Sequence, residues 1–279
     1  MSRLFQTSNS YVLWLIGVIT LIIGFCFVLH YHTMMNCMYW MMECCNFQHY
    51  QVFTFTLITL GILLVCSTMY FLFLSKKTKK FITKLNLYRT DCYESTVVES
   101  FQQKYSVQIQ VVDFTQPLAF THGFIHPQIL ISTSLIDLLQ PQELKAVLEH
   151  EYYHCQNRDP FKLSICFSLT RVFFFLPISR KLYKRYMIEK EIKADNFAIH
   201  KVGMKAVASA LYKLMMTNIP SSSCTTAHFQ NHSFHDTNTR IEVLLKGEYK
   251  RPSISLLEWM KSFISILFII FLIGCVSFL

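Results

Sequence analysis

Two histidines and a glutamate form the pattern H-E-x-x-H in this chain, at His150, Glu151 and His154. Residues four apart lie on one face of an α-helix, so the two imidazoles can be presented to one metal ion. The glutamate that follows the first histidine can act as a general base toward a water molecule. The pattern therefore predicts a zinc site with hydrolytic chemistry, provided that this segment is helical.

The residues around the pattern predict such a helix. Pro141 and Glu143 are typical of a helix start, because proline fits the first turn and an acid complements the positive end of the helix dipole. An apolar stripe follows, at Leu144, Val147 and Leu148. Asp159 should end the helix, because the residue before a proline is biased out of the α region. A buried structural helix with two coincidentally spaced histidines is the less favoured alternative.

A catalytic zinc site needs a third protein ligand, and Glu191 is the candidate. Asp195 follows four residues later, so it shares a helical face with Glu191. An aspartate there can hold a ligand histidine through the ring N–H that does not face the metal. Spacing alone leaves a second interpretation open, in which Glu189, Glu191 and Lys193 form a solvated charged face.

Residues 75–250 resemble the M56 family of membrane zinc metallopeptidases, in particular the protease domain of the β-lactam sensor-transducers, and also the related M48 gluzincins. The shared features are the stretch 119–132, the H-E-x-x-H helix closed by 158–160, the E-x-x-A-D run at 191–195, and an Arg-Ile pair at Arg240. The resemblance implies that Glu191 is the third ligand of one Zn²⁺ ion. It also implies an α+β gluzincin-like domain that hydrolyses peptide bonds with Glu151 as the general base.

The resemblance also suggests where a substrate would lie. In gluzincins an edge strand beside the zinc helix pairs with the extended substrate through backbone hydrogen bonds. By analogy this strand is at Ala119, Phe120 and Thr121, although an ordinary structural hairpin is equally compatible with the sequence. Tyr153 and Arg240 are candidate donors to the oxyanion or supports of the site.

One departure from the M48 pattern concerns the region before Arg240. M48 members carry His-Pro shortly before the Arg-Ile pair, whereas His235 is followed by Asp236 here. We therefore expect His235 to be a surface residue. The polar segment 221–238 is expected to form a loop or lid, and a second metal site at its histidines is disfavoured.

Hydropathy predicts a membrane protein that is mostly α-helical. Mean hydropathy is +0.33 and 52% of the residues are hydrophobic. The stretches 11–30, 52–74 and 262–279 are apolar enough to predict transmembrane helices. They define an N-terminal membrane region (1–74), a metallopeptidase domain (75–250) and a C-terminal membrane helix (within 251–279). We expect the first stretch to be a permanent anchor rather than a cleaved signal peptide.

The distribution of basic residues predicts the topology. The loop 31–51 contains no lysine or arginine, whereas six basic residues follow the second apolar stretch, at Lys76, Lys77, Lys79, Lys80, Lys84 and Arg89. The positive-inside rule therefore predicts a multi-pass protein of the cell membrane with its catalytic domain in the cytoplasm. The net charge of +9 indicates contact with the anionic lipid bilayer and not with nucleic acid.

The apolar segment 161–177 cannot be a further full span. It lies between His154 and Glu191, and zinc bonds of about 2 Å require all three ligands on one side of the membrane. Lys162 and Arg171 would also be costly at the bilayer centre. We therefore predict that this segment is re-entrant or interfacial.

The ten cysteines contain no C-x-x-C pair, which disfavours a zinc–thiolate site. Cys37, Cys44 and Cys45 fall in the predicted external loop, where a disulfide is compatible with an oxidising environment.

The combined prediction is a membrane-bound zinc metalloendopeptidase that cuts a protein substrate at the cytoplasmic membrane face. Regulatory proteolysis, with a transcriptional repressor as one candidate substrate, fits the M56 resemblance. A membrane-protein quality-control protease of the M48 kind is the first alternative. A non-catalytic signalling protein that keeps zinc for stability is the second. The sequence fixes neither the substrate nor the oligomeric state.

Overall fold

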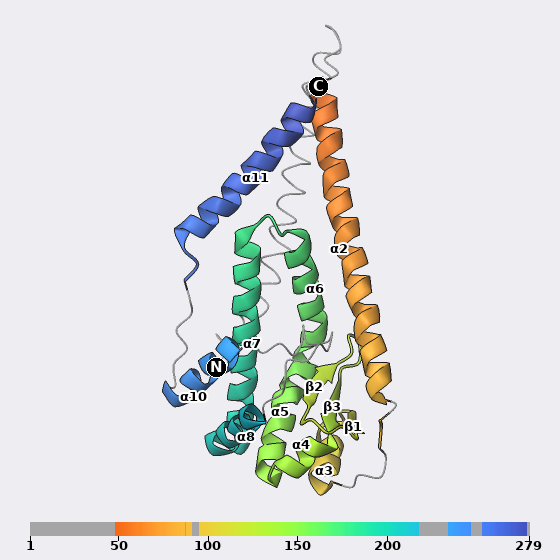
Figure 1. The fold of residues 1–279 in the computed structure, drawn as a ribbon, viewed down its shortest axis with the longest axis vertical. Helices are drawn as coiled ribbons and strands as arrows, with labels where there is room; N and C mark the ends of the chain where they lie inside the picture. Colours follow the sequence, from red (N-terminus) through yellow and green to blue (C-terminus); the bar gives the residue numbers. More distant parts are fainter. Residues whose placement is uncertain (1–47, 87, 91–94, 218–233, 247–252, 278–279) are drawn as a thin grey trace. The chain divides into compact units, whose positions relative to one another are not determined.

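The computed structural model describes residues 48–86, 88–90, 95–217, 234–246 and 253–277 (Figure 1). This part of the chain is mostly helical and contains one three-stranded sheet, which confirms the predicted balance of helix and strand. Two compact units divide the described residues. One comprises residues within 72–165 and 187–251, and the other comprises residues within 48–71, 166–186 and 253–277. The predicted helix 11–30 and Cys37, Cys44 and Cys45 lie outside the described residues.

The first unit contains the sheet. Its strands are β1 (Ile109–Val112), β2 (Ala119–His122) and β3 (Gln128–Ser132), in the order β1-β3-β2. β3 pairs in parallel with β1 and antiparallel with β2, and Thr121 lies opposite Ile129. The central strand is buried, with Ile129, Leu130 and Ile131 fully inaccessible. β2 is therefore an edge strand, as the substrate-strand hypothesis requires.

The turn between β2 and β3 depends on Gly123. Its φ of +94° lies in a region that L side chains rarely adopt, and an added Cβ would approach the carbonyl oxygen of His126 to 2.6 Å. This glycine therefore cannot be replaced without moving the backbone.

Helix α5 (Pro141–Asn157) carries both histidines of the H-E-x-x-H pattern. Its start is fixed by Glu143, whose carboxylate accepts hydrogen bonds from the backbone N–H of Gln140, at 2.8 Å, and from Lys213, at 2.7 Å. It ends at Arg158, which adopts the left-handed conformation (φ 51°, ψ 41°). The predicted helix end is confirmed, although the chain enters α6 (Asp159–Val172) immediately.

The main core holds α5 against the sheet. Buried residues come from α3 (Thr96–Tyr105), β3, α4 (Thr133–Leu138) and α5. They include Phe101, Ile129, Ile131, Leu135, Leu144 and Leu148. Burial of one such side chain contributes about 1.5–3 kcal/mol. This packing therefore fixes the helix that carries the histidines against the strand that approaches it.

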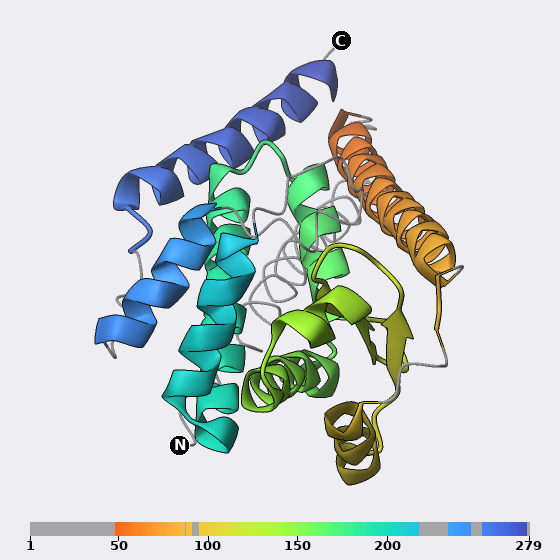
Figure 2. The same cartoon turned by 60° about the horizontal axis from the view of Figure 1, so that its bottom comes forward.

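Helix α7 (Pro177–Val202) and helix α8 (Met204–Met216) complete the surroundings of α5. The small residues Ala146, Ala198 and Val207 form a buried cluster that allows close helix packing. Figure 2 shows α8 alongside α5, and Glu143 joins them through hydrogen bonds with Lys213 and Ser209.

Helix α10 (Phe234–Lys246) corrects one expectation, because residues 234–238 were predicted to belong to a polar loop. These residues begin an amphipathic helix whose buried side includes Arg240 and Leu244, four residues apart. The rest of the polar segment, 218–233, lies outside the described residues.

The second unit contains the first half of α2 (Gln48–Asn86) and all of α11 (Leu256–Ser277). Inside this unit, the Ser262 hydroxyl accepts a hydrogen bond from the backbone N–H of Ile178 at 3.2 Å, and Lys181 pairs with Glu258. The predicted span 52–74 falls on α2, and the described part of the predicted span 262–279 falls on α11. Within the described ranges no helix combines the length and the apolarity needed to cross a membrane.

The segment 161–177 is not one continuous helix. α6 ends at Val172, residues 173–176 form a turn, and α7 starts at Pro177. The chain therefore leaves the histidines along one helix and returns to them with Glu191 on the next. The re-entrant or interfacial position of this segment in a membrane stays a prediction.

Candidate metal centre

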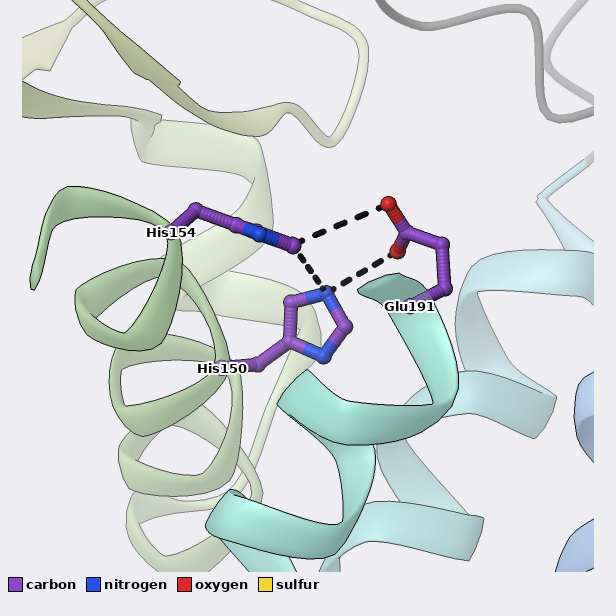
Figure 3. Close-up of side chains that lie close together, drawn as sticks. All are labelled: His150, His154 and Glu191. Atoms are coloured by element: carbon purple, nitrogen blue, oxygen red, sulfur yellow. Dashed lines mark hydrogen bonds and ion pairs between the residues drawn. The ribbon is translucent and has the colours of Figure 1, made fainter. Parts of the chain in front are cut away.

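The side chains of His150, His154 and Glu191 meet between α5 and α7 (Figure 3). The two Nε2 atoms are 3.2 Å apart, Glu191 Oε2 is 3.2 Å from His150 Nε2, and Glu191 Oε1 is 3.7 Å from His154 Nε2. Zinc bonds of about 2.0–2.1 Å place tetrahedral ligand atoms about 3.4 Å apart. With one ligand atom taken from each residue, the three atoms of this ligand triangle lie within 4.8 Å of one another, close enough to surround a single metal ion.

Each imidazole is oriented by an aspartate behind it. His150 Nδ1 lies 2.9 Å from Asp195 Oδ1, as the E-x-x-A-D spacing predicted. His154 Nδ1 lies 2.6 Å from Asp159 Oδ2. A hydrogen bond at Nδ1 fixes the ring and leaves Nε2 for a metal. Both Nε2 atoms consequently point to the same place.

Asp159 was assigned only a helix-ending role from the sequence. An uninterrupted helix would rotate residue 159 by about 140° from His154, away from its ring. The left-handed Arg158 instead turns Asp159 back toward the histidine. The available signal in the sequence was an acid five residues after the second histidine, at an expected helix end.

Arg240 supports Asp195. Its Nε and Nη2 donate to the two carboxylate oxygens of Asp195, at 2.8 Å and 2.7 Å, and both residues are buried. Burial alone raises the pKa of the Asp195 carboxyl, but Arg240 and His150 outweigh it and hold this pKa well below its usual range. Of the two candidate roles for Arg240, site support is the one that these contacts favour.

Sequence comparison places this arrangement in a known family. The profile of the family described as BlaR1 peptidase M56 matches residues 1–244. The chain belongs to the M56 peptidase family. The resemblance predicted from the sequence is thereby confirmed. Membership of this metallopeptidase family implies a bound metal, for which His150, His154 and Glu191 are possible ligands.

The chain is also similar to individual relatives. The M56 chain is 24% identical to Regulatory protein BlaR1 of Staphylococcus aureus over 163 residues, which are 56% of this chain and 27% of the relative. It is 38% identical to Protease HtpX homolog 2 of Methanosarcina mazei over 71 residues, which are 25% of this chain and 24% of the relative. The chain thus spans about a quarter of the length of these relatives. A crystal structure of S. mikatae Ste24p is similar with a TM-score of 0.44 and 16% identity, covering 88% of this chain and 66% of that one.

Glu151 of this M56 family member is joined to the edge strand. The hydroxyl of Thr121 lies 2.9 Å from Glu151 Oε2 and 2.8 Å from the Glu151 backbone oxygen. Ala119 packs against the main core, and Phe120 packs on the opposite face of the sheet with Leu130. Among the three candidate strand residues, Thr121 is thus the one whose side chain reaches the proposed general base.

Tyr153 packs beside the site. Its ring centroid is 6.0 Å from that of His154 and 5.6 Å from that of Phe197. Burial, with a smaller contribution from Asp159, raises the pKa of the Tyr153 hydroxyl to about 12. These contacts favour a packing role for Tyr153 over an oxyanion donor.

Lys190 is a further residue that the sequence did not indicate. Its ammonium lies 2.5 Å from Glu191 Oε1, and its side chain is buried. A lysine just before a candidate ligand was the available signal, but neighbours on a helix do not normally face each other.

The electrostatics of the cluster fit a divalent cation. Its four carboxylates face two cationic side chains, which leaves two negative charges: Glu151, Asp159, Glu191 and Asp195 against Lys190 and Arg240. Burial lowers the pKa of His154, but the charge of Glu191 and the hydrogen bond with Asp159 raise it to about 9. The pKa of His150 is also raised, because its bonds with Asp195 and Glu191 outweigh burial. The cluster thus favours added positive charge at both Nε2 atoms.

Proposed function

We propose that this M56 family member is a zinc metalloendopeptidase with His150, His154 and Glu191 as the metal ligands. The main supporting observation is the ligand triangle, whose two imidazoles are each oriented by an aspartate and whose three ligand atoms lie within 4.8 Å of one another. Membership of a peptidase family supports peptide-bond hydrolysis as the reaction.

Glu151 would act as the proton carrier of the reaction. When bound, zinc would supply Lewis-acid chemistry that polarises the scissile carbonyl and makes a water molecule more acidic. Glu151 would accept the proton of the attacking water and deliver it to the leaving amine. The Thr121 hydroxyl, 2.9 Å from Glu151 Oε2, would keep this carboxylate turned toward the site.

The substrate would bind as an extended chain along β2. In the described part of the sheet this strand pairs with β3 on one side only. A peptide added to the other side gains backbone hydrogen bonds that depend little on its sequence. Because Thr121 links β2 to Glu151, a peptide on this edge would lie close to the catalytic carboxylate.

A membrane location is part of the proposal. Large apolar side chains are exposed on α2 and α11, for example Val65, Met69, Phe263 and Phe271. Such surface is unusual for a protein in water and suits lipid. The lysine-rich stretch from Lys76 to Lys84 supports a multi-pass protein of the cell membrane whose peptidase domain is cytoplasmic.

Two physiological roles would use the same chemistry. Regulatory proteolysis, for example of a transcriptional repressor, is favoured because one relative is named Regulatory protein BlaR1. Quality control of membrane proteins is the alternative, since another relative is named Protease HtpX homolog 2. The number of captured substrates separates the two roles, because regulation requires few and quality control many.

The test is Glu151→Gln in the full-length protein. This change should keep zinc content and the melting temperature, yet lower the cleavage rate about 10²–10⁴-fold, the usual contribution of a general acid–base group. The variant should also retain bound substrate, which mass spectrometry can identify and which the parent protein should then cleave with zinc present.

Glu149→Gln is the matched control, because Glu149 is a buried glutamate on the same helix that bonds Tyr105 at 2.8 Å. This control should cleave like the parent. Unchanged cleavage by Glu151→Gln would refute the peptidase mechanism and favour a signalling protein stabilised by zinc.

A further inference from the structure

A buried ammonium group lies beside the ligand triangle. Lys190 is only 5% exposed, and its Nζ lies 2.5 Å from Glu191 Oε1. Transfer of such a charge into a protein interior costs several kcal/mol unless it is paired. The pairing with Glu191, together with attraction from the carboxylates of Asp159 and Glu151, offsets this cost.

The contact between Lys190 and Glu191 requires an unusual path. Adjacent residues of an α-helix project about 100° apart, so their side chains do not normally meet. The ammonium of Lys190 nevertheless reaches the carboxylate of Glu191. This contact links a buried cationic group directly to one oxygen of a proposed metal ligand.

The two oxygens of Glu191 consequently have different environments. Oε1 accepts from Lys190 Nζ and lies 3.7 Å from His154 Nε2, whereas Oε2 faces His150 Nε2 at the shorter distance of 3.2 Å. Arg240 Nη1 is also on the Oε2 side, 3.6 Å away. Oε1 is thus less available to a metal ion, because it already accepts a strong charge-assisted hydrogen bond.

We propose that Lys190 is a positioning residue that makes Glu191 bind the metal through Oε2 alone. This inference rests on the proposed zinc site. A carboxylate that used both oxygens would fill two coordination positions, while a catalytic zinc site must keep one open for water or substrate. Lys190 thus preserves the open position by acting on a ligand and not on the substrate.

The decisive measurement is the visible absorption spectrum of the Co²⁺-substituted full-length protein. The parent should show the intense bands of a four-coordinate ion. Lys190→Met frees Oε1, so the bands should lose intensity as the coordination number rises. Lys184→Met changes an exposed lysine on the same helix and should keep the parent spectrum.

A second pair of variants tests whether Lys190 acts on the metal through Glu191. In a Glu191→Gln background, Lys190→Met should cause no further spectral change, because the carboxylate it acts on is gone. If Lys190→Met does not fold, Lys190→Gln replaces it, since this change also removes the ammonium and should weaken the bands.

The outcomes distinguish this inference from the proposed function. A folded Lys190 variant with the parent spectrum overturns the role of Lys190, while the zinc site stands. A parent protein that binds neither Co²⁺ nor Zn²⁺ overturns the zinc site itself.

Discussion

Replacement of Arg240 by leucine tests whether the pair behind His150 is a structural part of the metal centre. Arg240 donates two hydrogen bonds to Asp195, and both side chains are buried. The change removes the guanidinium and its donors but keeps an apolar side chain at the position. Asp195 would then retain His150 as its remaining partner.

The expected loss follows from the burial of the pair. Removal of one partner of a buried ion pair leaves an uncompensated charge and costs about 3–5 kcal/mol. That is a large share of the stability of a typical domain, about 5–15 kcal/mol. Lys246→Leu on the same helix provides the control, since Lys246 forms an exposed ion pair with Glu242 four residues away. Salt and water screen that pair, so its loss should leave stability within experimental error.

Urea unfolding of the metal-free proteins, followed by circular dichroism, measures the free energy of unfolding of Arg240→Leu and of Lys246→Leu. The double variant Arg240→Leu, Asp195→Asn should recover part of the loss, because no unpaired charge remains. The reasoning is refuted if Arg240→Leu costs no more than Lys246→Leu. It is equally refuted if the losses of the two single changes simply add in the double variant.

Further predictions concern four other features. Asp159→Asn should weaken zinc binding about 10–100-fold in a chelator competition, because His154 loses the anion that orients it; unchanged affinity would contradict this. Thr121→Val should lower kcat/KM about 10–100-fold, as expected for loss of a charged-group hydrogen bond of about 1.5–3 kcal/mol, whereas Thr121→Ser should retain activity. Burial raises the pKa of Glu143, but Lys213 and other donors outweigh it and lower this pKa. The resulting stability exists above the unfolded pKa of about 4.3 and is lost as pH falls through the folded pKa. Lys213→Met should therefore melt below the parent at pH 7, and the gap should close under acid. A chelator should lower the melting temperature of the parent, and one equivalent of zinc should restore it.

Most of the site residues that could be predicted were predicted from helical spacing. His150 and His154 share a helical face, and Glu191 and Asp195 do the same on a second helix, so spacing alone placed each pair. That the two helices meet came from resemblance to a family.

The remaining contacts depend on conformations that spacing does not encode. Asp159 reaches His154 only because Arg158 adopts positive φ, which arginine rarely does. Lys190 reaches Glu191 against the normal divergence of helix neighbours. The Arg240 partner lies 45 residues away in the chain, so only tertiary packing could reveal it.

The left-handed conformation of Arg158 links the end of α5 to the proposed metal site, because it determines where Asp159 meets His154. Glycine adopts that conformation without the steric cost that a Cβ imposes, so Arg158→Gly should be tolerated, whereas a β-branched residue would resist it. The number of residues between His154 and Asp159 should consequently be fixed, since one inserted residue would move the Asp159 carboxylate away from the His154 ring. We therefore expect related sequences to keep this spacing of five residues and to differ in the exposed side chains between the two positions. An acid at this fixed distance after H-E-x-x-H gives a simple pattern with which to look for the same support in other chains.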